Sequence, residues 1–427
     1  MSSYLAKPQR FLVRPAPGWV DLTLQDVSAV LDAPTQKYKF KPAAVIEDGI
    51  VVVSDCDYRQ ALELVARLTT AHDVEWVIHS GRVSSRGDWK GFFEASGVGE
   101  LFKGGVAADT KVSAMVSHPV VGTAKDIREI AVATWGFGAG ENENEEAAES
   151  KSHRVRIDSG KNRTRILVSL AGEPLYKRGY KARVGGATAP LPEHHASACF
   201  LWSAKQIGGD LKNKIACGEV TVAAPFAGTG TTGFEAVCRV LNITPALTRD
   251  HYACEDFSFH PEATMSSIRK RLLAARGAGK PKIVFGDNTP EIFDALSSQV
   301  TSFKESIGVD IDVRMTLNDF LASPDTLAAT GFELFLPLNP PYGLRLAKQT
   351  GSVSIYERLG LALARLSKSN NISGYVICPD EDSWRALLTK LKSFTCHTCH
   401  FSHGGRDTRL VAFTSPSSRT PATYVKM

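Results

Sequence analysis

Short runs of apolar residues lie near the start of the chain and predict β-strands. Residues 11–15 (FLVRP) form one such run, and the stretch 43–54 (AAVIEDGIVVVS) contains two, with a Glu-Asp-Gly segment that predicts a turn between two strands. Apolar residues at helical spacing lie nearby, at 20–32 and at 57–68. The beginning of the chain therefore predicts a small α/β unit.

The succession of predicted strands and helices continues beyond residue 73 and extends this α/β organisation. Strands are expected at 74–80, 111–117, 153–158 and 163–170, with helices around 88–95 and 123–135. The run ENENEEAAES at 141–150 interrupts the pattern. Because glutamate and asparagine cannot bury apolar surface, this run predicts a solvated, disordered loop.

After residue 196 the pattern changes to strands that are each followed by a turn and a helix. The predicted strands are 220–226 (VTVAAPF), 251–257 (HYACEDF), 283–287 (IVFGD) and 332–338 (FELFLPL). Strands that alternate with helices predict a mostly parallel, doubly wound sheet. The end of the chain adds a strand, a helix through Trp384 and an antiparallel hairpin.

Composition and charge exclude fewer classes of protein than the succession of strands and helices does. With 427 residues, of which 43% are apolar, the chain is long enough for two or three globular domains. Its formal net charge of +5 tolerates a polyanionic partner without requiring one. The eight cysteines are spread through predicted strands and helices, which favours a reducing compartment over a disulfide-rich secreted scaffold.

Membrane and targeting signals are weak. No apolar stretch approaches the roughly 20 residues that a membrane-spanning helix needs, so we expect a soluble protein. The first residues include Lys7, Arg10 and Arg14 and no acidic residue before Asp21, which faintly resembles an organellar transit peptide. The long Ser/Arg-rich run of such peptides is missing. The sequence thus predicts an intracellular protein and does not decide between cytoplasm and mitochondrion.

A glycine-rich loop and two acids suggest a nucleotide-like ligand. The loop PFAGTGTTG at 225–233 follows a predicted strand and begins a helix, where glycines let the backbone approach a ligand closely or serve only helix packing. Glu255, near the end of the predicted strand 251–257, is placed to accept both ribose hydroxyls, and Asp287, at the end of 283–287, to bind an adenine amino group. The loop lacks the lysine of a P-loop, which disfavours nucleoside triphosphates.

The sequence NPPYG at 339–343 follows the apolar strand 332–338 and fits one chemical task. The exocyclic amine of a nucleobase is a poor nucleophile, because its lone pair is delocalised into the ring. The side-chain oxygen of Asn339 and the carbonyl of Pro340 can accept both N–H hydrogens and draw the nitrogen toward tetrahedral geometry. Pro341 stiffens the loop and Tyr342 stacks on the extruded base. The alternative is a proline turn that merely ends a strand.

These motifs resemble a known family. NPPYG after FELFLPL, and PFAGTGT before TGFEA, are similar to class I S-adenosylmethionine-dependent methyltransferases acting on base amino groups. The segments VSLAGEPLYKRGYK and APLPE, within 168–193, resemble the THUMP-containing guanine-N2 RNA methyltransferases of bacterial 23S rRNA and of archaeal and eukaryotic tRNA. FLVRPAPGWVDLTLQDVSAVL, EDGIVVVSDCDYRQALEL and RLTTAHDV resemble the ferredoxin-like domain that precedes THUMP in that family.

The resemblance implies a fold and a division of the chain. The fold is α/β, with a C-terminal Rossmann-like class I methyltransferase domain behind an N-terminal ferredoxin-like plus THUMP α+β module. The implied parts are a ferredoxin-like part at 1–70, a THUMP-like RNA-binding domain at 71–170 with the acidic loop 139–152, a basic linker at 171–195 and the methyltransferase domain at 196–427.

The resemblance also implies an activity, a cofactor and site residues. The expected reaction transfers a methyl group from S-adenosylmethionine to the N2 amine of guanine in structured rRNA or tRNA. Whether a pre-ribosomal particle or a small activating protein takes part is left open. The cofactor-binding residues are expected to be Pro225, Gly228, Gly230, Thr231, Glu255 and Asp287, and the catalytic residues Asn339, Pro340, Pro341 and Tyr342.

One departure from the family keeps two alternatives open. The family usually has an acid immediately before the proline of the glycine loop, and this chain has Ala224. Loss of a carboxylate near a cationic sulfonium cofactor weakens its attraction. A catalytically silent, RNA-binding ribosome assembly factor is therefore one alternative. An adenine-N6 methyltransferase is the other, because an NPPY motif serves that amine as well.

Basic residues are further candidates for RNA contacts, and a cysteine pair is a candidate for metal binding. Phosphate contacts are expected from the linker and from the segment after the NPPY motif, at Lys177, Arg178, Lys181, Arg183, Arg345 and Lys348. The spacing of Cys396 and Cys399 in CHTCH matches half of a zinc site. No second pair lies at the expected distance, so we expect two ordinary hairpin cysteines and no metal.

Overall fold

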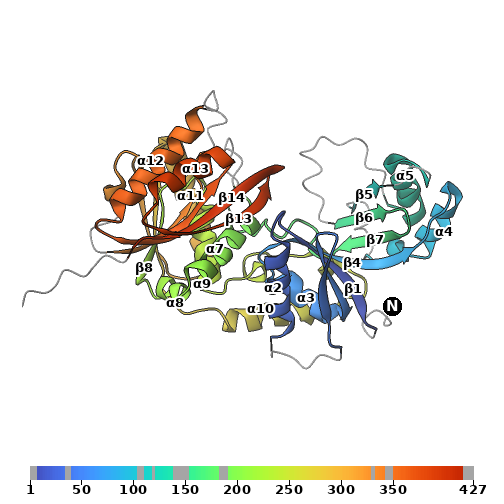
Figure 1. The fold of residues 1–427 in the computed structure, drawn as a ribbon. Helices are drawn as coiled ribbons and strands as arrows, with labels where there is room; N and C mark the ends of the chain where they lie inside the picture. Colours follow the sequence, from blue (N-terminus) through green and yellow to red (C-terminus); the bar gives the residue numbers. More distant parts are fainter. Residues whose placement is uncertain are drawn as a thin grey trace, which may run out of the picture. The chain divides into compact units, whose positions relative to one another are not determined.

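The chain forms two compact units, each built on a seven-stranded sheet (Figure 1). Unit 1 consists of Met1–Ala16, Val20–Arg178 and Thr244–Ala274, and unit 2 of Pro17–Trp19, Gly179–Ile243 and Ala275–Met427. The computed structural model describes residues 7–33, 40–102, 110–117, 121–137, 153–181, 191–327, 332–341 and 350–416. The acidic run at 141–150 lies outside the described residues.

The sheet of unit 1 has the strand order β2-β3-β1-β4-β7-β6-β5. Its strands are β1 (Gln9–Pro15), β2 (Ala43–Glu47), β3 (Ile50–Cys56), β4 (Ala71–Gly81), β5 (Thr110–Val116), β6 (His153–Ser159) and β7 (Thr164–Ser169). Neighbouring strands are antiparallel, except that β5 and β6 are parallel. The predicted ferredoxin-like and THUMP-like parts therefore contribute to one continuous sheet.

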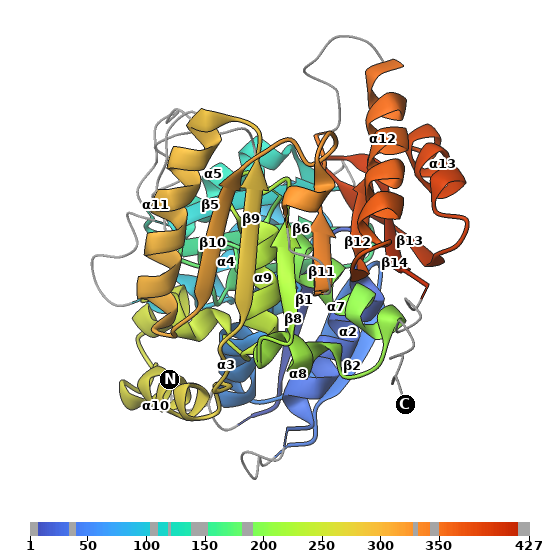
Figure 2. The ribbon, with the colours of Figure 1, turned by 90° about the vertical axis from the view of Figure 1, so that its left-hand side faces the viewer.

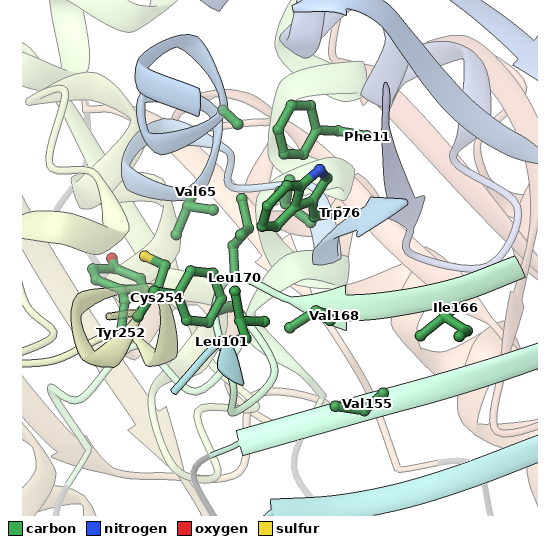
Figure 3. Close-up of a cluster of buried hydrophobic side chains, with 14 of the residues drawn as sticks. Phe11, Val65, Trp76, Leu101, Val155, Ile166, Val168, Leu170, Tyr252 and Cys254 are labelled. Atoms are coloured by element: carbon green, nitrogen blue, oxygen red, sulfur yellow. The ribbon is translucent and has the colours of Figure 1, made fainter. Parts of the chain in front are cut away.

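Alternation of residue types explains which face of this sheet is buried. In β6 every second residue is buried, including Val155 and Ile157, and the residues between them are partly exposed. The buried side chains join one cluster with Phe11 and Trp76 (Figure 3). The strands predicted from the sequence in this part of the chain are thus confirmed, because a half-buried strand carries the period of two that the sequence shows.

The helices of unit 1 include those expected from the sequence. They are α2 (Val20–Leu31), α3 (Tyr58–Arg67), α4 (Trp89–Glu94) and α5 (Ala124–Trp135), with the 3-10 turns η1 (Arg86–Asp88) and η2 (Val98–Glu100). Side-chain caps fix where two of them begin. Asp57 accepts a hydrogen bond from the amide of Gln60, and Thr123 accepts one from the amide of Asp126.

Residues 244–274 belong to unit 1, although the sequence predicts them to be part of the methyltransferase domain. This segment contains η5 (Pro245–Leu247), η6 (Ala253–Asp256) and α10 (Ala263–Ala274). Tyr252 and Cys254 lie in the buried cluster of unit 1 (Figure 3). The hydroxyl of Tyr58 donates to the carbonyl oxygen of Cys254 at 3.1 Å, which ties η6 to α3.

The sheet of unit 2 has the strand order β10-β9-β8-β11-β12-β14-β13 (Figure 2). Its strands are β8 (Val220–Ala224), β9 (Lys282–Asp287), β10 (Asp312–Leu317), β11 (Glu333–Leu338), β12 (Asn371–Cys378), β13 (Thr395–His403) and β14 (Arg406–Thr414). The first five strands in this order are parallel, and β14 is antiparallel to both of its neighbours. The expectation of a mostly parallel sheet is confirmed, whereas β10 is a strand that the sequence pattern did not predict.

Helices pack on both faces of this sheet. The helices of unit 2 are α7 (Glu193–Ile207), α8 (Leu211–Ala216), α9 (Thr231–Val240), α11 (Pro290–Ile307), α12 (Thr350–Leu366) and α13 (Glu381–Lys390), with the 3-10 turn η7 (Pro324–Thr326). On one face Leu336 of β11 joins a buried cluster with Leu359 of α12 and Leu387 of α13. On the other face the ring of Phe335 meets that of Phe200 of α7 at 5.3 Å. The doubly wound arrangement is therefore confirmed.

The last two strands form the expected hairpin and carry the cysteine pair. Cys396 faces Phe413 and Cys399 faces Leu410 across the ladder between β13 and β14. Residues three apart on a strand point to opposite faces, so these two thiols cannot bind one metal ion from this strand. Within the described ranges, no group of three or more histidine, cysteine or acidic side chains is arranged to hold a metal ion. The same ranges contain no helix that is long and apolar enough to cross a membrane.

Candidate active site

The candidate site lies where the parallel strands of unit 2 end. Chain order runs from β8 through β9 to β10 on one side of the sheet, and from β11 to β12 on the other. The ladder between β8 and β11 stops at the pair Val222 and Phe335, whereas β8 stays paired with β9 up to Ala224 and Phe285. The carboxyl ends of β8 and β11 are therefore unpaired with each other at the switch point of the topology, where open α/β sheets bind their ligands.

The loop after β8 has the open backbone that a bound ligand needs. Gly228 and Gly230 have φ angles of +49° and +80°, which residues with side chains rarely adopt. A Cβ atom built at Gly228 would meet no atom within 4 Å, so its backbone faces open space. A Cβ atom at Gly230 would lie 2.6 Å from the ring of Phe234. Gly230 is thus required for packing and Gly228 for access, and helix α9 begins directly afterwards at Thr231.

Asp287, the last residue of β9, lies beside this loop. Its Oδ2 accepts a hydrogen bond from the amide of Gly228 at 3.2 Å, and its Oδ1 accepts one from the amide of Thr289 at 3.1 Å. The residue is 8% exposed. Two backbone donors therefore fix the orientation of a carboxylate whose remaining lone pairs are available to a ligand.

Asn318 lies beside the candidate site and was not among the residues expected from the sequence. It follows β10, and its amide donates to the carbonyl oxygen of Asp287 at 2.9 Å. Its side-chain nitrogen donates to Oγ1 of Thr326 at 2.7 Å. The sequence contains one signal for this position, because the segment 312–318 (DVRMTLN) ends in a polar residue. The segment mixes polar and apolar residues, however, and so lacks the apolar run of a buried strand. As the edge strand of the sheet, β10 needs no such run.

The expected position of Glu255 is wrong. Residues 251–257 do not form a strand, and Glu255 lies in η6 of unit 1. Its carboxylate pairs with Arg269 at 2.7 Å and accepts a hydrogen bond from the amide of Tyr252 at 3.0 Å. In this sheet β8 lies between β9 and β11, and β9 is the next strand after β8 along the chain. Asp287 is therefore the acid at the end of the second strand of this sheet.

The NPPY motif begins at the end of β11, as expected. Asn339 is half-buried, Pro340 is buried and Pro341 is exposed. The motif thus starts on the strand next to β8, across the point where the β8–β11 ladder stops. Tyr342 and Gly343 lie outside the described residues, as do the two basic residues predicted to follow them, Arg345 and Lys348.

Ala224, the residue in place of the family's usual acid, ends β8 and is buried. It pairs with Phe285 of β9, and Pro225 and the glycine loop follow it. The nearest carboxylate hydrogen-bonded to this loop is that of Asp287. The structure therefore offers a backbone turn and one oriented acid at this edge, and no acid at position 224.

The linker residues that were predicted to contact RNA differ in their exposure and in their ion pairs. Arg178 is wrong as a phosphate ligand, because it is 3% exposed and its guanidinium donates to the carbonyl oxygens of Leu175 and Thr69 at 2.8 and 2.6 Å. Lys181 pairs with the buried Glu193 at 2.8 Å. Lys177 is partly exposed and pairs with Glu173, four residues earlier, and Arg183 lies outside the described residues. Charge in the sequence did not reveal which of these residues are buried.

Comparison with known proteins identifies relatives in sequence. No family profile matches the chain. A protein of Shewanella frigidimarina named ribosomal RNA large subunit methyltransferase K/L is 29% identical over 195 residues, which is 46% of this chain and 25% of that protein. A protein of the same name from Chromohalobacter salexigens is 28% identical over 219 residues, 49% of this chain and 28% of that protein. The chain thus spans about a quarter of the length of these curated relatives.

Solved structures share the fold over nearly the whole chain. SMU.472, a protein proposed to be a methyltransferase and crystallised with SAH, has a TM-score of 0.71 at 17% identity and covers 97% of this chain and 100% of its own. A possible methylase from Clostridium difficile 630 has a TM-score of 0.72 at 19% identity, covering 97% and 100%. TrmN from Thermus thermophilus has a TM-score of 0.60 at 17% identity, covering 95% and 100%.

The comparisons confirm the resemblance that the motifs suggested and the fold class that it implied. The chain has the fold of a class I methyltransferase joined to a second α/β unit, and its curated relatives are ribosomal RNA large subunit methyltransferases K/L.

Proposed function

We propose that this chain is an RNA methyltransferase that transfers a methyl group from S-adenosylmethionine to the N2 amine of guanine in rRNA or tRNA. One observation carries the proposal. The open backbone of Gly228 follows β8, the oriented carboxylate of Asp287 ends β9, and Asn339 follows β11, around the point where the β8–β11 ladder stops. The groups that we assign to the cofactor and to the amine are thus at the same edge of one sheet.

The residues at this edge fit S-adenosylmethionine. The open space at Gly228 admits a ligand against the backbone, and the carboxylate of Asp287 can accept both hydroxyls of a ribose. Asn318 follows the next strand, β10, and its backbone amide donates to the carbonyl oxygen of Asp287, so we assign the adenine ring to its neighbourhood. When bound, the cofactor supplies an electrophilic methyl group on a sulfonium.

The motif after β11 would prepare the nucleophile. The side-chain oxygen of Asn339 and the carbonyl of Pro340 accept the two N–H hydrogens of the base amine, which draws its nitrogen toward tetrahedral geometry. The prolines restrict the backbone, so these acceptors lose little entropy when they align. Most of the acceleration then comes from holding the amine in line with the methyl group, and the amine releases its proton during or after transfer.

The proposed substrate class is supported by the names of the relatives and by the linker sequence. The relatives carry the name of ribosomal RNA methyltransferases, which supports RNA, and large-subunit rRNA in particular. A pre-ribosomal particle as the form of the substrate, and a small activating protein, are part of the same proposal. Guanine N2 is preferred to adenine N6 because the LYKRGYK segment resembles the guanine enzymes.

A second candidate function is favoured by Ala224. Without a carboxylate at the end of β8, the site attracts a sulfonium less strongly, and an RNA-binding factor without catalysis would keep the same fold. Calorimetric titration with SAH separates the two candidates, because a silent factor gives no heat of binding. Incubation with rRNA or tRNA and labelled S-adenosylmethionine, followed by nucleoside analysis, then tests the product. Label in N2-methylguanosine is expected, and label in N6-methyladenosine would contradict the proposed base.

A further inference from the structure

A buried hydrogen bond joins the linker to helix α9, and the candidate active site does not use it. The hydroxyl of Tyr180 donates to Oε1 of Glu235 at 2.8 Å. Tyr180 is fully buried, and Glu235 is 1% exposed. Both residues belong to unit 2, and Glu235 lies in the second turn of α9, the helix that begins directly after the glycine loop.

The ring of Tyr180 packs behind the glycine loop. It meets the rings of Phe234 and Phe303 at 5.9 and 5.1 Å, and these two rings stack on each other at 4.2 Å. The ring of Phe234 occupies the space beside Gly230, because a Cβ atom built at Gly230 would lie 2.6 Å from it. The contacts therefore run from Tyr180 through Phe234 to the backbone of the loop.

The backbone around Tyr180 is held independently of Glu235. Oγ of Ser302, in α11, donates to the carbonyl oxygen of Tyr180 at 2.8 Å. The next residue, Lys181, pairs with the buried Glu193 of α7 at 2.8 Å. Loss of the Tyr180 hydroxyl alone should therefore leave the ring in place and remove only the hydrogen bond to α9.

Packing alone does not explain an acid at position 235. A carboxylate loses favourable hydration on burial unless hydrogen bonds replace it, whereas a leucine would fill the same space without that cost. Burial, together with the carboxylates of Glu235 and Glu193, raises the pKa of Tyr180, so its hydroxyl keeps its proton and remains a donor. Tyr375 also lies near Glu235, but its buried hydroxyl donates to no group in the described part of the chain. Of these two tyrosines, Tyr180 is thus the one that orients the carboxylate.

The glycine loop is held at two points. Asp287 accepts a hydrogen bond from the amide of Gly228 at 3.2 Å. Phe234, with Tyr180 behind it, supports Gly230. Because glycine adopts many backbone conformations, a loop of this kind keeps one shape only where its neighbours fix it.

On the basis of the function proposed above, we propose that Tyr180 and Glu235 are positioning residues of the cofactor site. Their hydrogen bond fixes α9, and α9 in turn holds the loop at Gly228 and Gly230 in the conformation that admits S-adenosylmethionine. Neither residue touches the ligand, since both act through Phe234 and the helix. A loop that is already in its binding conformation loses less entropy when the ligand arrives, so the hydrogen bond raises cofactor affinity as well as stability.

The test compares variants of the full chain. Tyr180→Phe removes the hydroxyl and keeps the ring, Glu235→Leu removes the acceptor, and Glu235→Gln keeps an acceptor oxygen. The matched control is Tyr356→Phe in α12, because Tyr356 is equally buried and its hydroxyl donates to the carbonyl oxygen of Ile377 at the same distance of 2.8 Å. Thermal unfolding gives the stability of each variant. Isothermal titration with SAH, at a temperature where all variants are folded, gives cofactor affinity.

Tyr180→Phe and Tyr356→Phe are both expected to lower the melting temperature, since each takes the donor from a buried acceptor. Only Tyr180→Phe should also bind SAH roughly 10-fold more weakly, at the lower end of what a hydrogen bond to a charged group contributes. Glu235→Leu should show a similar loss, and Glu235→Gln should keep most of the affinity. Residues that only stabilise the fold would change the melting temperature and leave SAH affinity unchanged.

The comparison of the two tyrosine variants decides the outcome, even if Glu235→Leu fails to fold. If wild type binds SAH and the two tyrosine variants bind it equally well, the positioning role is overturned and the proposed function is untouched. A loss of affinity confined to Tyr180→Phe supports the positioning role.

Hydrogen exchange of the loop separates the positioning role from the proposed function. The amides of Gly228 and Gly230 are hydrogen-bonded, to Asp287 and to the carbonyl oxygen of Ala227, so their exchange reports opening of the loop. If wild type binds no SAH, the proposed function fails, and faster exchange of these amides in Tyr180→Phe than in Tyr356→Phe still supports a hold on the loop. Equal exchange in the two variants would then overturn that hold as well.

Discussion

The amide nitrogen of Gly228 lies 3.2 Å from Oδ2 of Asp287. This hydrogen bond joins the loop after β8 to the end of β9, so the glycine turn and the acid form one rigid element. The second donor, the amide of Thr289, fixes the other oxygen of the carboxylate. A carboxylate oriented in this way before the ligand arrives loses little entropy on binding, which makes it an effective partner for two ribose hydroxyls.

Asp287→Ala is therefore expected to weaken SAH binding by roughly 100-fold, since hydrogen bonds to a charged group contribute about 1.5–3 kcal/mol each. Glu255→Ala is the matched comparison, because the sequence pattern assigned the ribose to that residue. Its carboxylate pairs with Arg269 in unit 1, so this variant should lose stability and keep its SAH affinity. Isothermal titration of both variants checks the assignment, and a larger loss for Glu255→Ala would reverse it.

Alanine substitutions at the two glycines of the loop are expected to affect different properties, ligand binding at Gly228 and stability at Gly230. Alanine at Gly228 meets open space, so Gly228→Ala should cost only about 1 kcal/mol of backbone strain and project a methyl group into the ligand space. Alanine at Gly230 collides with the ring of Phe234, so Gly230→Ala should destabilise the fold by roughly 2–4 kcal/mol. Thermal unfolding and SAH titration of both variants measure this. Equal losses of SAH affinity at equal stability would argue against a ligand at Gly228.

Asn339 is expected to act on the reaction rather than on cofactor binding. Asn339→Ala removes one of the two acceptors for the amine, and loss of one preorganised hydrogen-bonding group typically lowers the rate about 100- to 1000-fold. SAH affinity should remain close to that of wild type. Single-turnover methyl transfer to RNA, together with SAH titration, separates the two effects. A variant that loses SAH binding instead would place Asn339 in the cofactor site.

Sequence patterns predicted strands such as β6, whose residues alternate strictly. They failed where packing against distant segments decides whether a stretch forms a strand. β6 could be predicted because its own residues alternate between the buried core and the partly exposed opposite face. Residues 251–257 are rich in apolar residues and were predicted to be a strand, yet they contain the 3-10 turn η6, because the segment 244–274 packs into unit 1 instead of extending the sheet of unit 2. No local pattern records that choice.

Only the part of the candidate site that depends on local motifs could be predicted from the sequence. Glycines and the NPPY motif are local signals, so the sequence pointed to Gly228 and Asn339, which the structure places at the ends of neighbouring strands. The assignment of acids to strand ends depends on counting strands, and the false strand at 251–257 shifted the count by one. The sequence therefore assigned Asp287 to the adenine, whereas its place at the end of the second strand leads us to propose the ribose, and Asn318 was not considered.

The packing of segment 244–274 predicts that unit 1 depends on it. Phe257 is fully buried among Tyr58, Trp76 and Phe102, at ring distances of 6.4, 6.4 and 5.6 Å. Phe257→Ala should therefore destabilise unit 1 by about 3–5 kcal/mol. Hydrogen exchange of the α3 amides should accelerate, while the amides of β11 and β12 in unit 2 serve as the internal control. Unchanged exchange in α3 would show that the segment contributes little to this core.

Asp73, a buried acid of the unit 1 sheet, predicts a pH dependence of stability. Burial raises the pKa of Asp73 to about 6 from its ordinary value of 3.8. As the pH rises from about 4 to about 6, the unfolded chain releases this proton first, so the group favours unfolding progressively over that window and not below it. Asp73→Asn removes the effect and keeps an oxygen acceptor for Ser169, which donates to Oδ1 at 2.8 Å. Urea denaturation of both proteins between about pH 4 and pH 7 should show the variant gaining about 3 kcal/mol relative to wild type across the window. A difference that stays flat or shrinks with rising pH would mean that Asp73 is already ionised in the folded protein, held so by Arg14 and its neighbours on the same face.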